Sequence, residues 1–363
     1  MDITKIVITG GPCGGKSTAM SWIQRTFAQM GYTVLFIPEI ATELIGGGVA
    51  PWTCGTGDEY QKCLFLLQIE KEKIYERAAR TMQAEKILIV CDRGTLDNKA
   101  YMDPAEFADV VDSIHANEVE LRDGYDAVFH LVTAAKGAEE FYTTANNGAR
   151  RETPEEAAVL DDNLIAAWTG HPHFRVIDNA DDFEGKMQHL IAEISSFLGE
   201  PEPLEIERKF LIEYPDVFWL ESLPNCRRIE IIQTYLKTDG EDEVRLRQRG
   251  GDGHYVYFQT TKRRVDDIKR VEIERRLTKD EYLKLLADAD PGKRPIQKTR
   301  YCLTYDNQYF EIDVYPFWND KAIAEIELSD ENAEIVFPEQ IKVIKEVTGD
   351  ARYKNASLAL IKE

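Results

Sequence analysis

The hydrophobic pattern of this chain changes a little past its midpoint, and that change constrains the fold more than any other feature. Residues 1–199 alternate short, continuous apolar stretches with helical periodicity, the pattern of a parallel sheet covered by helices on both faces. Residues 204–363 contain eight segments in which apolar and polar residues alternate. These predict antiparallel strands in a barrel or sandwich, with helices inserted at 279–288 and near the C-terminus. Pro201 and Pro203 mark the linker.

The composition excludes several classes of protein. Of 363 residues, 44 are basic and 65 acidic, and the net charge of −21 disfavours nonspecific binding to nucleic acid or to an anionic membrane. No apolar run is long enough for a membrane span, and the N-terminus has no signal-peptide pattern. The six cysteines show no C-x-x-C pairing, so free thiols in a reducing compartment are expected. We therefore expect a cytoplasmic protein of two domains.

A glycine-rich segment lies between the first predicted strand and the first predicted helix. It contains G-x-x-x-x-G-K-S, in the strand–turn–helix context that a phosphate-binding loop requires. Glycines let the backbone approach a phosphate, Lys16 adds a positive charge, and the Ser17 hydroxyl can bind Mg²⁺. A glycine-rich turn with a chance Lys-Ser pair is the alternative. The predicted nucleotide-binding residues are Gly10, Gly11, Pro12, Cys13, Gly14, Gly15, Lys16, Ser17 and Thr18.

Charged residues follow other predicted strands of this half. Asp92 ends a strand and is placed to hold Mg²⁺, although it could instead cap a turn. Glu39 ends another strand at the sheet edge where ligands bind, and would be a general base, an acid that supports the metal, or a surface acid. Arg150 and Arg151 follow a flexible Asn-Asn-Gly. They would stabilise transferring phosphoryl charge from a mobile lid, or would be solvated at a helix start.

This half resembles the AAA_28 group of P-loop NTPases over about residues 3–199. The resemblance rests on the stretches GGPCGGKST, PEIATELI, CDRG, HLVTAAKGAEEFY, NNGARRE and HPHFRVIDN. The group is related to small-molecule kinases, and the resemblance implies that the loop around Asn179 lies near the nucleotide base. No N-K-x-D motif selects GTP, so ATP and GTP are both open as ligands.

Charged residues alternate on one face of most predicted strands in the second half, and several of these faces carry a single sign. In the stretch LEIERKFLI, the residues Glu205, Glu207 and Lys209 share one face, and Arg208 and Phe210 share the other. A solvated outer face is one interpretation. The segregation of charge by sign favours a polar interior, in which Arg and Lys neutralise phosphate and carboxylates hold Mg²⁺ or Mn²⁺. Arg208 would then need a partner outside. Similar alternation recurs in Arg245, Arg247 and Arg249, in Glu272 and Glu274, in Lys298 and Arg300, in Glu311 and Asp313, and in Glu325 and Glu327.

The second half resembles the CYTH family, the triphosphate tunnel metalloenzymes, over about residues 204–363. The E-x-E-x-K signature of the family occurs as EIERKF, and it is followed in the family's order by VRLRQR, TTKR, KTRY, IDVY, AEIEL and YKNASLA. The resemblance implies an eight-stranded antiparallel tunnel in which Lys209 orients or helps to activate the attacking water. It implies metal ligands at Glu205, Glu207, Asp313, Glu325 and Glu327, and triphosphate ligands at Arg245, Arg247, Lys262, Lys298 and Arg300. Glu272 and Glu274 match an acid pair whose roles are not separated.

Two phosphate motifs in one chain favour an enzyme. The main hypothesis is that the tunnel hydrolyses tripolyphosphate, or a nucleoside or organic triphosphate, with Mg²⁺ or Mn²⁺, coupled to an ATP- or GTP-binding domain. A second is a nucleotide-switched regulatory protein that binds polyphosphate or phosphoinositide without turnover. The domain order resembles that of the TRPL translocation defect proteins of insects, which are linked to GTP and phosphoinositide binding. A third is a small-molecule kinase with an accessory tunnel. The intact tunnel motifs favour the first hypothesis.

Overall fold

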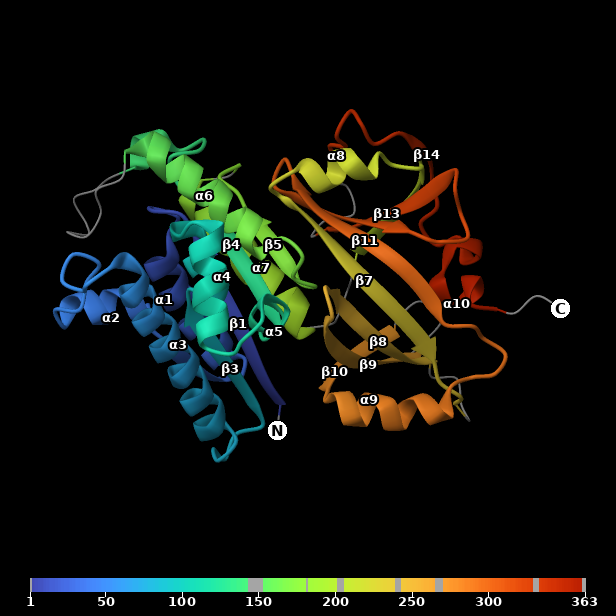
Figure 1. The fold of residues 1–363 in the computed structure, drawn as a ribbon, viewed down its shortest axis with the longest axis horizontal. Coiled ribbons are helices and arrows are strands. Elements are labelled where there is room, and N and C mark those ends of the chain that lie inside the picture. The colour runs from blue at the N-terminus through green and yellow to red at the C-terminus, as the bar shows by residue number, and fades with distance from the viewer. Residues whose placement is uncertain are drawn as a thin grey trace. The chain divides into compact units, whose positions relative to one another are not determined.

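The structure is a computed structural model, and it consists of two compact units, Met1–Pro201 and Glu202–Glu363. The first is an α/β unit with a parallel sheet, and the second is built on a curved antiparallel sheet (Figure 1). Both predicted fold classes are confirmed. No helix in the described part of the chain is long and apolar enough to cross a membrane. The structure describes residues 2–142, 153–180, 182–200, 206–238, 243–264, 270–328 and 333–360.

The first unit has a parallel sheet with the strand order β2-β3-β1-β4-β5. Strands β3 and β4 are buried over nearly their whole length, which explains their continuous apolar sequence. The order of the strands reverses beside β1, and ligands bind at the carboxyl ends of the strands at such a point in open α/β sheets. The strands are β1 (Asp2–Gly10), β2 (Thr33–Ile37), β3 (Lys86–Asp92), β4 (Ala127–Leu131) and β5 (Phe174–Ile177).

Helices cover both faces of this sheet (Figure 1). On one face, Phe27 of α1 and Leu190 of α7 belong to the same buried cluster as Ile8 of β1. On the other face, Trp168 of α6 and Val7 of β1 lie together, and α3 runs along β2 and β3. The helices are α1 (Lys16–Gln29), α2 (Ile40–Gly46), α3 (Gly57–Ala79), α4 (Pro104–Ser113), α5 (Glu118–Arg122), α6 (Pro154–Trp168) and α7 (Phe183–Leu198), with short 3₁₀ turns η1 (Thr95–Tyr101) and η2 (Glu139–Phe141).

The second unit has one antiparallel sheet, with nine strands in its described part, in the order β10-β9-β8-β7-β11-β12-β13-β6-β14. The eight predicted strands are β6 to β13, and β14 is a short ninth strand that pairs with β6 at one edge. The predicted helix at 279–288 is α9 followed by a 3₁₀ turn. The strands are β6 (Ile206–Glu213), β7 (Cys226–Tyr235), β8 (Glu243–Gly251), β9 (His254–Arg264), β10 (Arg270–Leu277), β11 (Ile296–Tyr305), β12 (Gln308–Val314), β13 (Lys321–Leu328) and β14 (Val343–Glu346). The helices are α8 (Val217–Ser222), α9 (Lys279–Leu285) and α10 (Asn355–Leu358), with 3₁₀ turns η3 (Leu286–Asp288) and η4 (Ala351–Tyr353).

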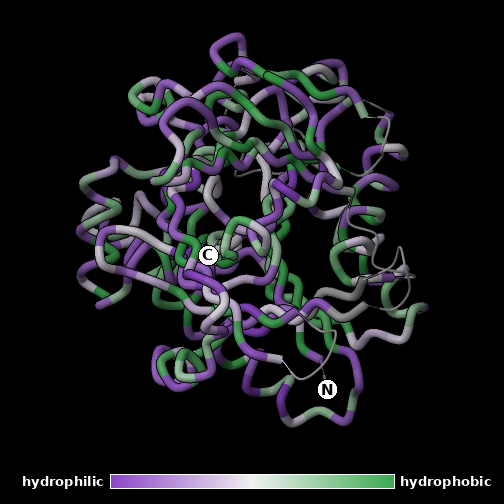
Figure 2. Tube along the Cα trace, turned by 90° about the vertical axis from the view of Figure 1, so that its right-hand side faces the viewer, coloured by the Kyte–Doolittle hydropathy of each residue, from purple (hydrophilic) through white to green (hydrophobic). Residues whose placement is uncertain are grey.

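The apolar faces of these strands point outward, toward the helices. Leu246 of β8 packs with Tyr282 of α9, and Phe210 of β6 belongs to the same cluster as Leu220 of α8. The charged faces are inside: Lys298 is only 4% exposed. Figure 2 shows hydrophilic and hydrophobic residues interspersed along the Cα trace. The interpretation of the charged face as a solvated outer face is therefore wrong for the part of it that holds Lys298, Asp313 and Glu325. Glu207 and Glu327, by contrast, are exposed.

Arg208 lies on the outer face of β6, where it pairs with an acidic residue. Its guanidinium donates two hydrogen bonds to Glu346 of β14, at 3.1 and 2.8 Å, and lies over the ring of Phe210. The ion pair holds the edge strand β14 against β6, where the two strands also pair through their backbones. The expectation of an outside partner for Arg208 is thus confirmed.

Candidate functional site

The glycine-rich loop of the first unit connects the end of β1 to the start of α1. Gly10 has a φ of +143°, and a Cβ there would lie 2.1 Å from the carbonyl oxygen of Leu131. Gly15 precedes the helix with a φ of +96°. Both positions therefore require glycine. The first turn of α1 carries no acidic residue, so its N–H groups and the positive end of the helix dipole are available to an anion.

Lys16, at the start of α1, has its side chain folded back over the loop. Its ammonium donates to the carbonyl oxygen of Gly10 at 3.1 Å. Burial and the nearby Arg93 guanidinium lower the pKa of Lys16 to about 8. A phosphate at this loop would stabilise the charged form. Ser17 and Thr18 are exposed in the same turn, so their hydroxyls are accessible to a ligand.

Asp92 ends β3 beside the glycine-rich loop. Its Oδ1 atom is buried and accepts no hydrogen bond from the residues that the structure describes. Burial raises the pKa of Asp92, and the Lys16 ammonium opposes this shift only in part. A buried carboxylate oxygen without a donor suits a hard cation, so the residue fits the Mg²⁺ role predicted for it.

Glu39 lies between β2 and α2 and is paired with Arg93. Arg93 Nε donates to Glu39 at 2.5 Å, and the Thr42 hydroxyl donates to it as well. Burial alone would raise the pKa of Glu39, but Arg93 and Lys16 outweigh it and lower the pKa to about 2. Glu39 is therefore at the site rather than an isolated surface acid. A firmly ionised, paired carboxylate is better suited to orienting Arg93 than to accepting a proton.

A buried hub beneath the loop was not predicted from the sequence. Asp161 of α6 is fully buried, and its Oδ1 accepts hydrogen bonds from the backbone N–H groups of Gly11 and Thr133 at 3.0 and 3.1 Å. The same oxygen lies 3.0 Å from His130 Nε2, and Oδ2 accepts from Lys136 at 3.0 Å. The carboxylate thus ties the glycine-rich loop to the segment after β4. Asp161 sits in an unremarkable helical pattern, so no local signal could have identified it.

Asn179 follows β5 and holds that same segment. Its side-chain amide donates to the carbonyl oxygens of Thr133 and Lys136 at 2.8 and 2.7 Å. Its Oδ1 accepts from Lys186 at 2.7 Å, and Lys186 also donates to the Val132 carbonyl. The polar atoms of the Asn179 side chain are therefore directed into the protein. That the loop around Asn179 lies near a nucleotide base stays a prediction.

The interior of the second unit contains a dense network of ion pairs on β11, β12 and β13. Lys298 pairs with Asp313, and both are almost completely buried. The Arg300 guanidinium forms a bidentate pair with Asp313 at 2.7 Å for each bond, and also contacts Glu311 and, at 3.0 Å, Glu325. The predicted triphosphate ligands Lys298 and Arg300 are thus brought together with the predicted metal ligands Asp313 and Glu325.

Lys209 of β6 extends this network toward Glu207. Its ammonium lies 2.6 Å from Glu325 and 3.8 Å from Glu207. Burial and repulsion by Glu325 raise the pKa of Glu207 to about 7, against the attraction of Lys209 and of Lys262 on β9. Lys262 of β9 thus acts on Glu207 of β6, although the two strands are far apart in the strand order, and Figure 1 shows that the sheet is curved. The sheet is therefore curled around its charged face.

Strand β8 contributes arginines to the same interior. Arg247 Nη1 lies 3.5 Å from Glu274 of β10, and Thr260 of β9 donates to the same carboxylate at 3.0 Å. Arg245 shares the face of Arg247, as the alternation requires. Arg249 also lies on this face, is buried, and was not among the predicted ligands. Its alternation with the other two arginines was the signal that could have identified it.

The acids of the interior suit a divalent cation unequally. Asp313 and Glu325 are already paired with cations. Partial burial and the like charge of Glu325 make an ionised Glu207 costly, although the Glu207 side chain is 46% exposed and lies 3.8 Å from Lys209. A hard cation would offset that cost. Glu327 is exposed and lies opposite Glu207 in the register of β6 and β13. Among the described residues no three possible ligands converge on a common point. The metal roles of Glu207 and Glu327 therefore stay predictions from the sequence.

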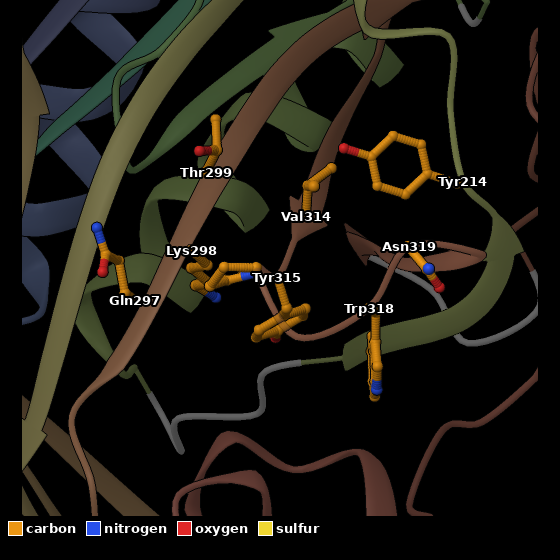
Figure 3. Close-up of a pocket in the computed structure, with 9 residues that line it drawn as sticks. Tyr214, Gln297, Lys298, Thr299, Val314, Tyr315, Trp318 and Asn319 are labelled. Atoms are coloured by element: carbon orange, nitrogen blue, oxygen red, sulfur yellow. The ribbon is translucent and has the colours of Figure 1, made fainter.

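A pocket of about 400 Å³ lies where β11 begins and β12 ends (Figure 3). Thr299, Val314 and Tyr214 line it, and Trp318 closes one side. Lys298 also borders it, but its ammonium pairs with Asp313 in the interior. An aromatic and amide lining of this kind does not provide the cations that a polyphosphate needs. The charged interior, and not this pocket, is the candidate triphosphate site.

Some predicted site residues lie outside the described residues. They are Glu205, Arg150 and Arg151, and the side chain of Glu272. Their roles stay predictions from the sequence.

Comparison with known proteins identifies both units. The AAA_28 family, an AAA domain, matches residues 5–186, and the CYTH domain family matches residues 203–359. An inorganic triphosphatase of Nitrosomonas europaea is 35% identical over 160 residues, which are 43% of this chain and 97% of that protein. An inorganic triphosphatase of Acetivibrio thermocellus is 34% identical over 158 residues, which are 42% of this chain and 92% of that protein. A crystal structure of an inorganic triphosphatase, 31% identical, covers 44% of this chain and 96% of its own, with a TM-score of 0.32. The chain therefore belongs to the AAA_28 family through its first unit and to the CYTH family through its second.

Proposed function

We propose that the second unit hydrolyses triphosphates, with inorganic tripolyphosphate as its substrate, and that the first unit binds ATP or GTP. The observation that carries this proposal is the interior of the second unit, in which buried Lys298 and Arg249 and the 11% exposed Arg300 lie on one face of the sheet with buried carboxylates. Burying so many charges is costly for a purely structural sheet. The inorganic triphosphatases that match the second unit over nearly their whole length support the choice of substrate.

The cations of the interior would bind the substrate. The oxygens of a tripolyphosphate would take the place of Glu311 and Glu325 as acceptors for Arg300. They would also accept from Lys298 and from the arginines of β8. Asp313 fixes the Arg300 guanidinium through two hydrogen bonds before any substrate enters. Such preorganised donors stabilise the charge that develops on the phosphate oxygens in the transition state.

The acids on β6 and β13 would hold Mg²⁺ or Mn²⁺. Glu205, Glu207 and Glu327 would take this role, which the sequence alone assigns to them. When bound, such an ion neutralises phosphate oxygens and lowers the pKa of a water molecule. Lys209, held between Glu325 and Glu207, would orient the attacking water and keep the neighbouring carboxylates apart.

In the first unit, the loop from Gly10 to Thr18 would bind the phosphates of the nucleotide and Asp92 would hold Mg²⁺. Two observations support this part of the proposal. Asp92 Oδ1 accepts no hydrogen bond in the described part of the chain, and the first turn of α1 carries no acidic residue that would repel an anion. The coupling of the two sites belongs to the proposal as well. Adding a non-hydrolysable ATP or GTP analogue should then change the rate of tripolyphosphate hydrolysis, and no change with either analogue at saturation would refute coupling.

The activity is tested by following phosphate release from tripolyphosphate, ATP, GTP and thiamine triphosphate with Mg²⁺ or Mn²⁺. Tripolyphosphate should be cleaved by the wild type and by Lys16→Ala, but not by the Glu205→Gln/Glu207→Gln variant. An inactive wild type, or unchanged turnover in the double variant, would refute the tunnel reaction. Nucleotide turnover that is lost only in Lys16→Ala would assign that activity to the first unit.

A further inference from the structure

Arg93 of the first unit is held in an unusual position beside the glycine-rich loop. It follows Asp92 at the carboxyl end of β3, and its N–H donates to the Ile8 carbonyl of β1 at 3.1 Å. Its backbone is left-handed, with a φ of +71°. That conformation is unfavourable for a residue with a Cβ and is found where the surrounding structure imposes it, often at functional sites.

The guanidinium of Arg93 is only partly satisfied. Nε donates to Glu39 at 2.5 Å, and Nη1 lies 3.6 Å from Asp97. Nη1 is buried and has no hydrogen-bond partner among the residues that the structure describes. The side chain as a whole is 15% exposed, so little water can reach it. A buried guanidinium N–H without an acceptor is destabilising unless a ligand supplies one.

Other groups around Arg93 are incomplete in the same way. Asp92 Oδ1 and the hydroxyl of Tyr60 on α3 are also buried without a hydrogen-bond partner in the described part of the chain. The Tyr60 side chain is 3% exposed, and its hydroxyl is close enough to Glu39 to feel that charge. Arg93 and the Lys16 ammonium both act on Glu39. Unsatisfied polar atoms thus recur at Asp92 and Arg93, at the end of β3, and at Tyr60 of α3, as in a site that a polar ligand completes.

We propose that Arg93 is a catalytic residue of the first unit that binds the terminal phosphoryl group of the nucleotide. The inference rests on the proposed binding of ATP or GTP at the loop. The lysine of such a loop reaches the β- and γ-phosphates, and the acid at the end of the buried strand would hold a metal ion that neutralises phosphate charge. A guanidinium beside both groups therefore meets the γ-phosphate. With Nε held by Glu39 and Nη1 no closer than 3.6 Å to Asp97, the terminal edge of the fork has no hydrogen-bond acceptor in the described part of the chain and would donate to phosphate oxygens.

Arg93 would act during hydrolysis by stabilising charge and would transfer no proton. An oxygen of water bonds to the γ-phosphorus while the bond from that phosphorus to the bridging oxygen breaks. The diphosphate leaves with the electron pair, and the proton of the water is released to solvent. Negative charge accumulates on the oxygens in transit, which is where a fixed arginine is most effective.

The alternative is that Arg93 only anchors the turn before α2 to the sheet through Glu39. Binding at equilibrium separates the two roles. ADP lacks the terminal phosphate, whereas ADP with aluminium fluoride and Mg²⁺ imitates the phosphoryl group in transit. Loss of an arginine that contacts only the terminal phosphoryl group should weaken binding of ADP with aluminium fluoride, and should hardly change the affinity for ADP alone.

The test measures the affinity of the full chain for both complexes by titration calorimetry, in the wild type, Arg93→Ala, Arg93→Lys and Arg80→Ala. Arg80 is a matched control, because it lies in the same unit, is 64% exposed and pairs with Glu76 at 3.2 Å. We expect Arg93→Ala to weaken the fluoride complex roughly 10- to 100-fold and ADP less than about 3-fold. Arg93→Lys keeps a charge for Glu39 but not the fork, so it should weaken the fluoride complex in a chain that still folds. Arg80→Ala should change neither affinity.

Other results of this titration would refute the inference or the nucleotide site on which it rests. If both Arg93 variants bind the fluoride complex like the wild type, or lose ADP to the same extent, Arg93 does not bind the terminal group and the inference fails. If the wild type binds neither ADP nor the fluoride complex, the proposed nucleotide site itself fails, and the inference fails with it.

Discussion

Replacing Asp161 by Asn should destabilise the first unit far more than the same change at its neighbour Asp162. Asp161 is fully buried and accepts from two backbone N–H groups and from Lys136, beside His130. Asp162 also pairs with Lys136, at 2.6 Å, but its side chain is 71% exposed. The pair of variants therefore compares a buried hub with a solvated ion pair at adjacent positions.

The magnitude follows from the partners that each variant loses. Removing the charge of a buried, hydrogen-bonded pair typically costs 3–5 kcal/mol. The Asn oxygen can still accept from the two N–H groups, and Lys136 is 29% exposed, so we expect about 3 kcal/mol for Asp161→Asn. In a unit of this size each kcal/mol lowers the unfolding temperature by about 2–4 °C, which gives about 6–12 °C. Asp162→Asn should cost less than about 1 kcal/mol.

The stability difference between the wild type and Asp161→Asn should also depend on pH. Burial alone would raise the pKa of Asp161, but His130 and Lys136 lower it below the ordinary range of an aspartate. A lowered pKa stabilises the folded state above the pKa of the unfolded chain, about 3.9, and this contribution is lost as the pH falls toward the folded value. The difference between wild type and Asp161→Asn, measured by thermal unfolding, should therefore shrink below about pH 4. A variant that unfolds within 2 °C of Asp162→Asn at pH 7 would refute the hub.

Three further predictions concern other contacts. Gly10→Ala should abolish nucleotide binding in titration calorimetry, because its Cβ would lie 2.1 Å from a carbonyl oxygen; wild-type affinity would contradict the loop geometry. Lys298→Met should cost the second unit about 3–5 kcal/mol in urea unfolding by leaving Asp313 with one cation fewer. Arg208→Ala, at an exposed pair, is its control and should cost less than about 1 kcal/mol. Burial lowers the pKa of Lys186 to about 8, so the free energy of unfolding of the wild type should rise between about pH 8 and 10.5. That of Lys186→Met should rise less over the same range, and an equal rise would contradict the lowered pKa.

Much of the fold could be predicted because its cause is local. Alternation with a period of two places most charged residues of these strands on one side, so β6 to β13 could be predicted from the order of residues, and the segregation of charge by sign favoured a polar interior. The need of Arg208 for an outside partner followed from the same alternation, and Glu346 supplies it. The short edge strand β14 was not predicted, because its four residues are all exposed and show no alternation in burial.

The polar contacts of the sites could not be predicted, because they join residues that are distant in sequence. Asp161 contacts Gly11 across 150 positions, and Arg93 reaches Glu39 across 54. The partners of Asp313 depend on its register with Arg300 between β11 and β12. The sequence identified these residues' chemistry in part, but only the packing of helices and strands shows which charges meet.

The central claim, that the charged interior of the second unit hydrolyses tripolyphosphate, is tested most directly by one comparison. Phosphate release from tripolyphosphate with Mg²⁺ is measured for the wild type, Arg300→Ala and Lys16→Ala, with the folding of each variant checked by circular dichroism. The account predicts that Arg300→Ala lowers kcat/KM at least about 100-fold, as expected when a charged donor to the reacting phosphate is lost, and that Lys16→Ala keeps the wild-type rate. A folded Arg300→Ala variant as active as the wild type, or activity lost only in Lys16→Ala, would contradict it.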